Sequence, residues 1–167
     1  NWPRVKATKN PALMTPTTIG GGRVRFAFPP GCTTPCLPVR DDEGRGLIYP
    51  MSGETDATAP EIYLALQMGC KLKMTAGWIA EQHDERPLLG YFRHCLQERA
   101  RHAKGTLPNE LWKFFGNSIY GKTAQGLRRR SRYDIASGES VPLEMSAITC
   151  PGYAAYVTGF IRALLCE

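Results

Sequence analysis

The spacing of hydrophobic and polar positions changes near residue 87 of this 167-residue chain. Before it, short alternating stretches lie between segments rich in Gly, Pro and Thr, which is typical of strands and turns. After it, Leu88, Leu89, Phe92 and Leu96 recur at helical spacing, as expected for an amphipathic helix. The pattern therefore predicts an α+β fold, with strands mainly in the first half and helices mainly in the second.

The first half is predicted to contain short strands and one helix. Residues 1–22 are rich in Pro, Thr and Gly and are expected to be a loop or linker. A helix is expected to begin near Pro60 and Glu61 and to end at Gly69. The expected strands lie at 23–28, 36–39, 46–50 and 71–80.

The second half is predicted to contain a helical hairpin, a β-hairpin and a final helix. The first helix should run from Pro87 to Gly105, and the second should begin near Pro108, a residue that suits the first turn. Asn109 and Glu110 then lie at the electropositive end of the second helix. The remaining expected elements are strands at 132–135 and 142–145 and a helix over 151–165.

The charge balance favours a polyanionic partner. The chain has 21 Lys and Arg against 15 Asp and Glu, a net charge of +6, which favours nucleic acid or nucleotide phosphates. The uncharged run 150–161 falls short of the ~20 residues of a membrane helix, and no secretory signal opens the chain. We therefore expect an intracellular, cytoplasmic protein without a membrane segment. The start at Asn1 and the apolar stretch before Glu167 suggest a piece of a longer chain.

The six cysteines do not show metal-ligand spacing. Cys32 and Cys36 form a C-x-x-x-C pair, and the other four lie singly without a histidine at ligand distance. Histidines are equally scattered. We expect reduced thiols, as in a cytosolic protein, and no metal site within the chain.

The stretch GNSIYGKT, Gly116–Thr123, matches the phosphate-loop pattern G-x-x-x-x-G-K-[ST]. A phosphate loop should leave an aliphatic strand and enter a long helix, yet NELWKFF before it begins like a helix, and Gly126 and four arginines follow. One alternative is therefore a P-loop nucleotide-binding protein that uses Lys122 and Thr123. Another is a non-catalytic basic module that binds single strands through Arg128–Arg132 and nearby aromatic residues.

A different set of residues follows the same predicted helix. Lys113, Asn117 and Tyr120 lie at i, i+4 and i+7, which places a cation, an amide and an aromatic hydroxyl along one side. These groups suit a nucleotide, because Lys can bind phosphate oxygens, Asn can hydrogen-bond sugar or phosphate, and Tyr can pack on a base. Gly121 would let a base or backbone approach closely.

The stretch K-F-F-G-N-S-I-Y-G, residues 113–121, resembles motif B of the family B DNA polymerases, K-x-x-x-N-S-x-Y-G, at every fixed letter. Five fixed letters should occur by chance on the order of 10⁻⁴ times in a chain of this length, against about 10⁻² for the phosphate-loop pattern. The helices near 87–105 and 148–165 resemble, more weakly, the first fingers helix and the helix that returns to the palm. The N-terminal strands are similar, less specifically, to phage and protein-primed members.

This resemblance implies a DNA-directed DNA polymerase fragment with palm strands and an α-helical fingers hairpin. It divides the chain into palm-side strands (1–86), fingers (87–126) and a return to the palm (127–167). Residues implied to act on the nucleotide and in catalysis are Lys113, Asn117 and Tyr120, with Arg101 and Arg99 (or Lys104) lining the facing sides of the hairpin with Lys113. Residues implied to contact DNA are Ser118, Gly121, Lys122, Thr123 and Gln125.

The resemblance also implies partners and a cofactor for the whole enzyme. The partners are a DNA primer-template and deoxynucleoside triphosphates, and the cofactor is Mg²⁺ held by palm aspartates. In the chain, LIYP imitates the end of D-x-x-S-L-Y-P, but Gly44 stands at the Asp position, and Y-x-D-T-D does not occur. The metal ligands are therefore expected outside this chain, and Asp41–Glu43 are interpreted as solvated charges. The type of primer, the oligomeric state and a phage or mobile-element origin stay open.

Overall fold

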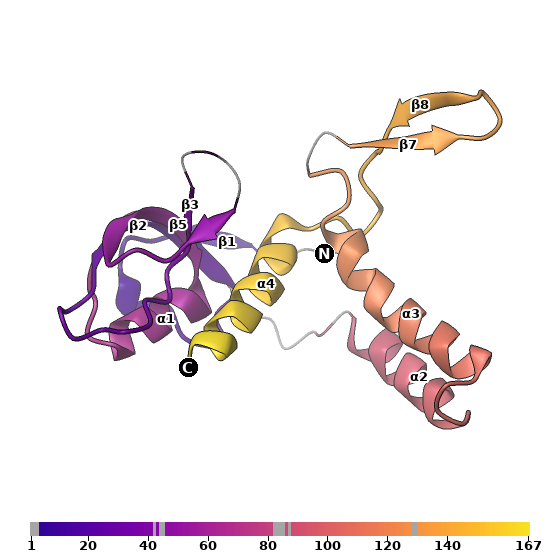
Figure 1. The fold of residues 1–167 in the computed structure, drawn as a ribbon, viewed down its shortest axis with the longest axis horizontal. Coiled ribbons are helices and arrows are strands. Elements are labelled where there is room, and N and C mark those ends of the chain that lie inside the picture. Colours follow the sequence, from indigo (N-terminus) through magenta and orange to yellow (C-terminus); the bar gives the residue numbers. More distant parts are fainter. Residues whose placement is uncertain (1–3, 42, 44–45, 82–85, 87, 128–129) are drawn as a thin grey trace. The chain divides into compact units, whose positions relative to one another are not determined.

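The computed structural model describes residues 4–41, 43, 46–81, 86, 88–127 and 130–167, and the chain forms two units. One unit combines Asn1–Gln82 with Ala155–Glu167, and the other is His83–Ala154. We call them the sheet unit and the hairpin unit, and each is described by itself. Figure 1 shows their elements along the chain.

The sheet unit is built on four antiparallel strands in the order β1-β6-β2-β5. These strands are β1 (Val5–Ala7), β2 (Gly20–Ala27), β5 (Ser52–Thr58) and β6 (Lys71–Ala80). The other elements of the unit are η1 (Pro11–Leu13), the short pair β3 (Val39–Arg40) and β4 (Leu47–Ile48), α1 (Ala59–Gln67), and most of α4 (Pro151–Cys166).

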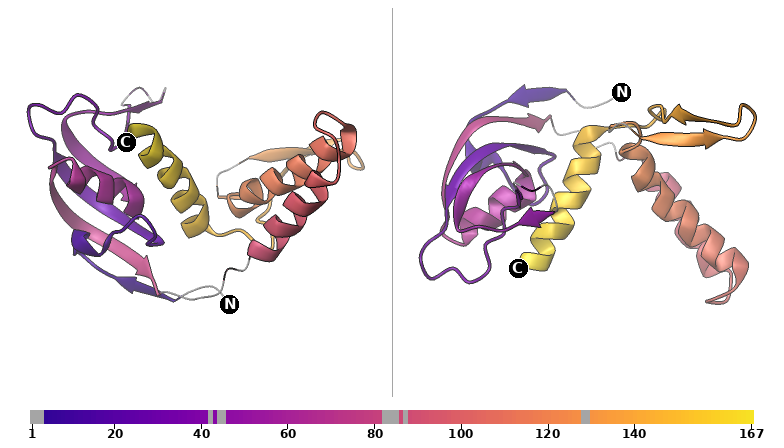
Figure 2. Two further views of the ribbon diagram at one scale, coloured as in Figure 1. Left: turned by 90° about the horizontal axis from the view of Figure 1, so that it is seen from below. Right: turned by 45° about the horizontal axis from the view of Figure 1, so that its top comes forward.

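The two faces of the sheet differ as the alternation in β2 predicts. Val24 and Phe26 are buried with Ile62 of α1, which lies across the sheet in Figure 2, and apolar burial of this kind drives folding. On the other face, Arg23 and Arg25 lie opposite acidic residues of β5. Arg23 forms two hydrogen bonds with Asp56, at 3.1 and 2.8 Å. One face is therefore hydrophobic core, and the other carries exposed ion pairs.

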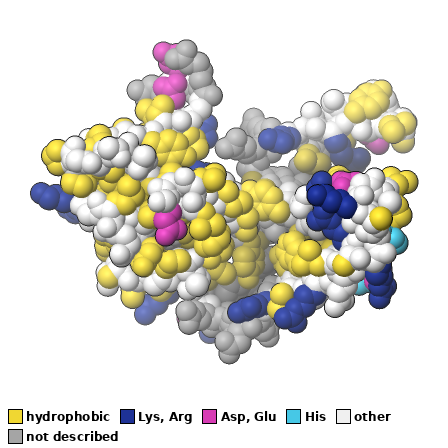
Figure 3. All heavy atoms as spheres, turned by 60° about the horizontal axis from the view of Figure 1, so that its bottom comes forward, with side chains coloured by type: hydrophobic (Ala, Val, Ile, Leu, Met, Phe, Trp, Pro, Cys, Tyr) yellow, Lys and Arg dark blue, Asp and Glu magenta, His cyan; other side chains and the backbone are white. Residues whose placement is uncertain are grey.

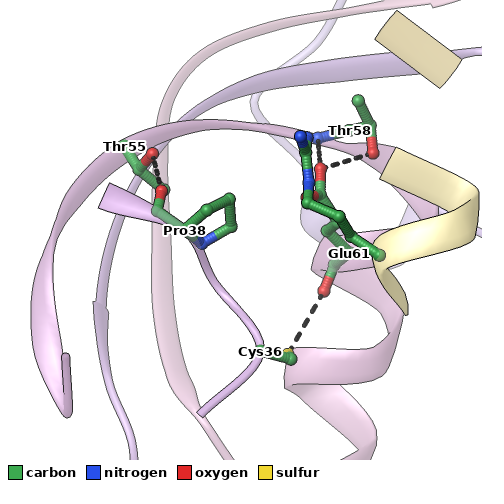
Figure 4. A network of polar contacts seen from close by, with 6 residues as sticks. Cys36, Pro38, Thr55, Thr58 and Glu61 are labelled. Atoms are coloured by element: carbon green, nitrogen blue, oxygen red, sulfur yellow. Dashed lines mark hydrogen bonds and ion pairs between the residues drawn. The ribbon is translucent and has the colours of Figure 1, made fainter. Parts of the chain in front are cut away.

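Helix α1 begins in a buried polar network that also holds α4 (Figure 4). The Glu61 carboxylate accepts hydrogen bonds from the Thr58 amide at 2.9 Å and the Thr58 hydroxyl at 2.6 Å, as in a capping box. Its other oxygen accepts one from Arg162 Nε of α4 at 2.7 Å. Gly159 of α4 lies so close that an added Cβ would collide with the Thr58 hydroxyl. The fully buried Glu61 is thus both capped and charge-paired.

The hairpin unit contains two antiparallel helices and a two-stranded ribbon (Figure 1). Its helices are α2 (Leu89–Ala100) and α3 (Leu107–Thr123), and its strands are β7 (Ser131–Asp134) and β8 (Glu139–Pro142). The first residues of α4 complete it. Gly105, at φ +85°, lies in the turn between the helices, where the left-handed conformation favours glycine.

The predicted α+β fold class is confirmed, and several elements have the predicted bounds or nearly so. Strand β6 covers the predicted 71–80, and α3 and α4 begin where Pro108 and Pro151 suggest. Helix α1 starts at Ala59, one residue before Pro60, because Thr58 is its cap. Helix α2 ends at Ala100 rather than at Gly105; its predicted start at Pro87 lies outside the described residues.

Several predictions for the strands were wrong. The strand expected at 36–39 is displaced, because β3 is Val39–Arg40. Residues 1–22 are not only loop, because β1, η1 and the start of β2 lie within them. Residues 52–58, which had no predicted element, form β5 as the edge partner of β2. In the β-hairpin the second strand is Glu139–Pro142 rather than 142–145, because it pairs with β7 across a tight turn that includes Gly138 at φ +70°.

Candidate nucleotide-binding site

The phosphate-loop alternative is excluded by the position of its residues in α3. Gly116–Thr123 form the C-terminal half of one continuous helix, Leu107–Thr123. A phosphate binds the amides at a helix N-terminus, whereas the C-terminus presents carbonyl oxygens and a negative partial charge. Thr123 is also buried, and its hydroxyl donates to the Tyr120 carbonyl at 2.7 Å. Lys122 and Thr123 therefore cannot cradle a phosphate as a loop would.

The predicted stripe of Lys113, Asn117 and Tyr120 is exposed along one side of α3. Lys113 Nζ lies 3.0 Å from a carboxylate oxygen of Glu110, one turn earlier. Both members of this ion pair are about half exposed, and such surface pairs contribute little to stability. The lysine can therefore exchange this partner for a more highly charged anion at small cost.

The facing sides of α2 and α3 are formed by other residues than expected. Tyr91 donates a hydrogen bond to the Phe115 carbonyl at 2.9 Å, and the His94 and Trp112 rings meet edge to face at 5.3 Å. Cys95 is buried beside Gly116, where an added Cβ would lie 3.8 Å from the cysteine Cβ. The expectation that Lys113 and Arg101 line the facing sides was wrong, because aromatic and small residues fill them.

Of the two predicted arginines, Arg99 lies on the side of the hairpin that carries Lys113. Its Nε is 3.5 Å from the side-chain oxygen of Asn109, which stands one turn before Lys113 on α3. Arg101, just after the last residue of α2, instead pairs with Glu98 on that helix. Lys104 is exposed beyond the end of α2. The structure thus places Arg99 beside α3, one turn before Lys113.

The residues expected to contact DNA differ in accessibility. Gly121 and Lys122 are exposed, and nothing lies within 4 Å of an added Cβ at Gly121. Ser118 is half-buried and donates its hydroxyl to the Phe115 carbonyl at 2.9 Å. Gln125 is half-buried, accepts from Lys122 at 2.8 Å and donates to the Glu144 carbonyl at 2.9 Å. With Thr123 buried, Gly121 and Lys122 present the open surface here.

The segment Glu144–Cys150 encloses the C-terminal end of α3, and the sequence patterns do not predict this contact. Ser146 donates its hydroxyl to the Lys122 carbonyl at 2.7 Å, and Thr149 donates to the Gln125 carbonyl at 2.9 Å. The Cys150 amide donates to the Thr123 carbonyl at 2.9 Å. We call Ser146, Thr149 and the Cys150 amide the hydroxyl clasp. No sequence signal identifies it, because its partners are backbone carbonyls more than twenty residues away in the chain.

The described residues hold no cluster that fits Mg²⁺. No group of three or more His, Cys, Asp or Glu side chains within them is arranged to hold a metal ion. The cysteines described are free thiols, and burial raises the pKa of the Cys36 thiol to about 12. No helix in the described part of the chain is long and apolar enough to cross a membrane.

A hollow of about 530 Å³ opens beside the sheet, but its lining offers little chemistry. Most of its wall is glycine and alanine, from Gly20–Gly22, Ala57 and Gly77. Its charged lining residues, Arg23 and Asp56, are already paired with each other. The candidate site is therefore the exposed side of α3. Figure 3 shows, on one face of the molecule, hydrophobic side chains next to Lys and Arg.

The fold is similar to part of a solved DNA polymerase structure. The structure of Phi29 DNA polymerase complexed with primer-template DNA matches 98% of this chain and 30% of its own, with a TM-score of 0.54 and 12% identity. The Phi29 polymerase complex with primer-template DNA and incoming nucleotide substrates matches the same shares, with a TM-score of 0.52 and 16% identity. At this identity the likeness shows the fold alone.

The sequence similarity extends along the entire chain. It is 40% identical, over 176 aligned residues, to the primer-independent DNA polymerase PolB of Escherichia coli. The alignment takes in 100% of this chain but 20% of that polymerase, so the chain spans about a fifth of the length of its relative. No protein-family model matches the chain. The resemblance to DNA polymerases predicted from residues 113–121 is confirmed.

Proposed function

We propose that this chain is part of a family B DNA-directed DNA polymerase, in which the hairpin of α2 and α3 binds the incoming deoxynucleoside triphosphate beside a primer-template. The observation that carries the proposal is the exposed stripe of Lys113, Asn117 and Tyr120 on a helix that contains every fixed letter of motif B. The 40% identity to a DNA polymerase supports it, as does a fold shared with a polymerase bound to primer-template and nucleotides.

The proposed roles follow from the chemistry of each side chain. Lys113 donates a compact positive charge to the triphosphate, and Arg99 adds a second cation from α2. Asn117 hydrogen-bonds the sugar or a phosphate, and the Tyr120 ring packs against the base. Gly121 leaves room for the template, and the exposed Lys122 meets the DNA backbone. Ser118 and Gln125 would act through the hydrogen bonds that they already make.

Domain names and the metal belong to this proposal as well. We assign α2 and α3 to the fingers and the sheet unit with α4 to the palm side, following the division at residues 87 and 126. Mg²⁺ would supply the charge neutralisation needed for nucleotidyl transfer. We place its ligands outside this chain because the sequence lacks the aspartates of D-x-x-S-L-Y-P and Y-x-D-T-D; the described residues also form no group of His, Cys, Asp or Glu that could hold a metal ion. Such an enzyme acts on DNA inside the cell.

The test is single-nucleotide insertion by the full polymerase that contains this segment. Lys113→Ala is expected to lower kcat/KM for the correct nucleotide by roughly 30- to 1000-fold, the effect of losing a charged contact to phosphate. Lys73→Ala, an exposed lysine of β6, serves as the matched control and should stay within about twofold. An unchanged kcat and nucleotide KM in Lys113→Ala would refute the proposal.

The same assay separates Tyr120 from Lys122 and from a simple basic module. Tyr120→Ala should impair insertion and its accuracy more than Lys122→Ala, because only Tyr120 is proposed to touch the base pair. A basic single-strand binder would behave differently: its DNA binding would fall steeply with salt and would not depend on the nucleotide. Equal insertion by Tyr120→Ala and the wild type would count for that alternative.

A further inference from the structure

In the hydroxyl clasp, each of the two hydroxyls has a partner that accepts its proton and a backbone amide that donates to it. Ser146 donates its one proton to the Lys122 carbonyl and accepts from the Ile148 amide at 3.3 Å. Thr149 donates its one proton to the Gln125 carbonyl and accepts from the Ser146 amide at 2.8 Å. Each hydroxyl has one donor and two acceptor positions, so this assignment uses both protons and gives the Lys122 and Gln125 carbonyls one donor each.

The clasp acts on the end of α3 that ordinarily has free carbonyls. The last four carbonyls of an α-helix have no partner within the helix and are otherwise left to water or to a cap. Here the carbonyls of Lys122 and Thr123 in the last turn of α3, and of Gln125 two residues beyond the helix, each receive a donor from Ser146–Cys150. The chain between β8 and α4 passes this end of α3 in Figure 1. The end of the helix is thus held by a segment distant in sequence rather than by solvent.

Close packing reinforces the clasp one residue further along. Gly126 has φ +77°, and an added Cβ there would lie 2.7 Å from the Met145 nitrogen and 2.8 Å from its Cα. Any larger residue would therefore both strain the backbone and push Met145 away. The Gln125 side chain also donates to the Glu144 carbonyl at 2.9 Å. Hydrogen bonds and contact together fix the exit of α3.

A short path of hydrogen bonds joins the clasp to Tyr120. The Cys150 amide donates to the Thr123 carbonyl at 2.9 Å, and the Thr123 hydroxyl donates to the Tyr120 carbonyl at 2.7 Å. Thr123 is buried, so water does not compete for this hydroxyl. Rotation or unwinding of the last turn of α3 would break these bonds and re-aim Tyr120 and Gly121. The backbone beneath the proposed base-contacting residue is therefore held from Ser146–Cys150.

We propose that Ser146 and Thr149 are positioning residues that hold the end of α3, so that Tyr120 keeps the orientation needed to distinguish correct from incorrect nucleotides. This inference rests on the proposed polymerase function. Neither hydroxyl is expected to touch nucleotide or DNA. They act through the Lys122 and Gln125 carbonyls, whose hydrogen bonds are made before any nucleotide binds, so the orientation is preorganised rather than induced.

The test measures correct and incorrect single-nucleotide insertion by the full polymerase. Ser146→Ala and Thr149→Val each remove one hydroxyl, and each should lower the ratio of correct to incorrect kcat/KM by about fivefold, the effect of one lost hydrogen bond. Thr149→Ser retains the hydroxyl and should keep the wild-type ratio. Ser140→Ala, an exposed serine of β8, is the control and should also keep it. A purely structural role would lower activity for both nucleotides alike and leave the ratio unchanged.

The outcomes separate the failure of this inference from the failure of the proposed function. Wild-type selectivity in both Ser146→Ala and Thr149→Val, with reduced selectivity in Tyr120→Ala, overturns the positioning role and leaves the polymerase assignment in place. Wild-type insertion by Tyr120→Ala and Lys113→Ala overturns the assignment itself. Circular dichroism at the assay temperature checks that each variant is folded. If a variant without the hydroxyl unfolds, the test relies on Thr149→Ser. Reduced selectivity in that folded variant overturns the positioning role.

Discussion

The sheet unit and the hairpin unit are stabilised by different kinds of contact. In the sheet unit, α1 and the strands bury a continuous hydrophobic cluster that includes Val24, Leu37 and Ile62, each at 0% exposure. Among the described residues of the hairpin unit, few are buried, and two of those, Asn109 and Thr123, are polar. Burial of apolar side chains stabilises the sheet unit. In the hairpin unit, hydrogen bonds from side chains to backbone carbonyls supply many of the stabilising contacts.

This difference matches what each unit is proposed to do. A surface that must bind a charged nucleotide needs side chains in water, and α3 keeps Lys113 and Asn117 exposed. Its geometry then depends on directional bonds such as those of Asn109, which donates to the Arg99 and His102 carbonyls at 3.0 and 3.1 Å. Hydrogen bonds fix orientation more sharply than nondirectional apolar contact does. Substitutions in the two units should therefore have different costs.

The largest difference in the free energy of unfolding is expected when one aliphatic residue in each unit is replaced by alanine. Ile62→Ala should lower the free energy of unfolding by about 2–5 kcal/mol, because it leaves a cavity in the core. Leu107→Ala, at the start of α3 and 73% exposed, should change it by less than about 0.5 kcal/mol. Urea denaturation of both variants, followed by circular dichroism, measures the difference. Equal losses would break the comparison.

An intermediate effect is expected for a polar residue of the hairpin unit. Asn109→Ala should cost about 1–3 kcal/mol, because it removes the donors to two carbonyls at the end of α2. Asn117→Ala on the same helix is the matched control for stability and should be near neutral, since Asn117 is exposed. Urea denaturation again provides the measurement. A neutral Asn109→Ala would show that the hydrogen bonds do not hold the hairpin.

The smallest effect is expected on the exposed face of the sheet. The hydrogen bond from Arg23 lowers the pKa of the Asp56 carboxyl, so the pair stabilises the fold while Asp56 is ionised. This contribution is fully present above the ordinary Asp pKa of about 3.9 and is lost as pH falls through the lower folded pKa. The urea midpoints of wild type and Asp56→Asn should differ slightly at neutral pH and converge in acid. A difference that does not shrink as the pH is lowered below the ordinary Asp pKa would contradict this.

Local patterns predicted the fold where an element carries its own signal. Helices α3 and α4 have proline starts, and β6 alternates along its length, so their positions follow from adjacent residues. Strand β5 carries no such signal, because its sequence SGETDAT is polar. It becomes a strand by pairing with β2. Glycines 20–22 suggest a loop, yet they let β2 approach its neighbours: a Cβ at Gly20 would lie 2.6 Å from the Trp78 carbonyl.

The candidate site was predictable to the extent that it lies on one helix. The spacing of Lys113, Asn117 and Tyr120 places them on one side of α3 without any knowledge of tertiary structure. The position of Arg99 relative to Lys113 depends on how α2 packs against α3. Aromatic residues form the contacts between the two helices, where charged residues were expected. The hydroxyl clasp was not predictable, because the partners of Ser146, Thr149 and Cys150 are backbone carbonyls, which no sequence pattern identifies.

The contact at Gly159 also has a consequence for how this sequence can change over time. Since an added Cβ there would collide with the Thr58 hydroxyl, a larger residue at 159 becomes acceptable only after position 58 has become smaller. Glu61 and Arg162, 101 positions apart, are similarly tied, because losing either leaves the other's charge without its partner. Substitutions at these four positions should therefore be tolerated only together or in a particular order. The four positions should covary among relatives.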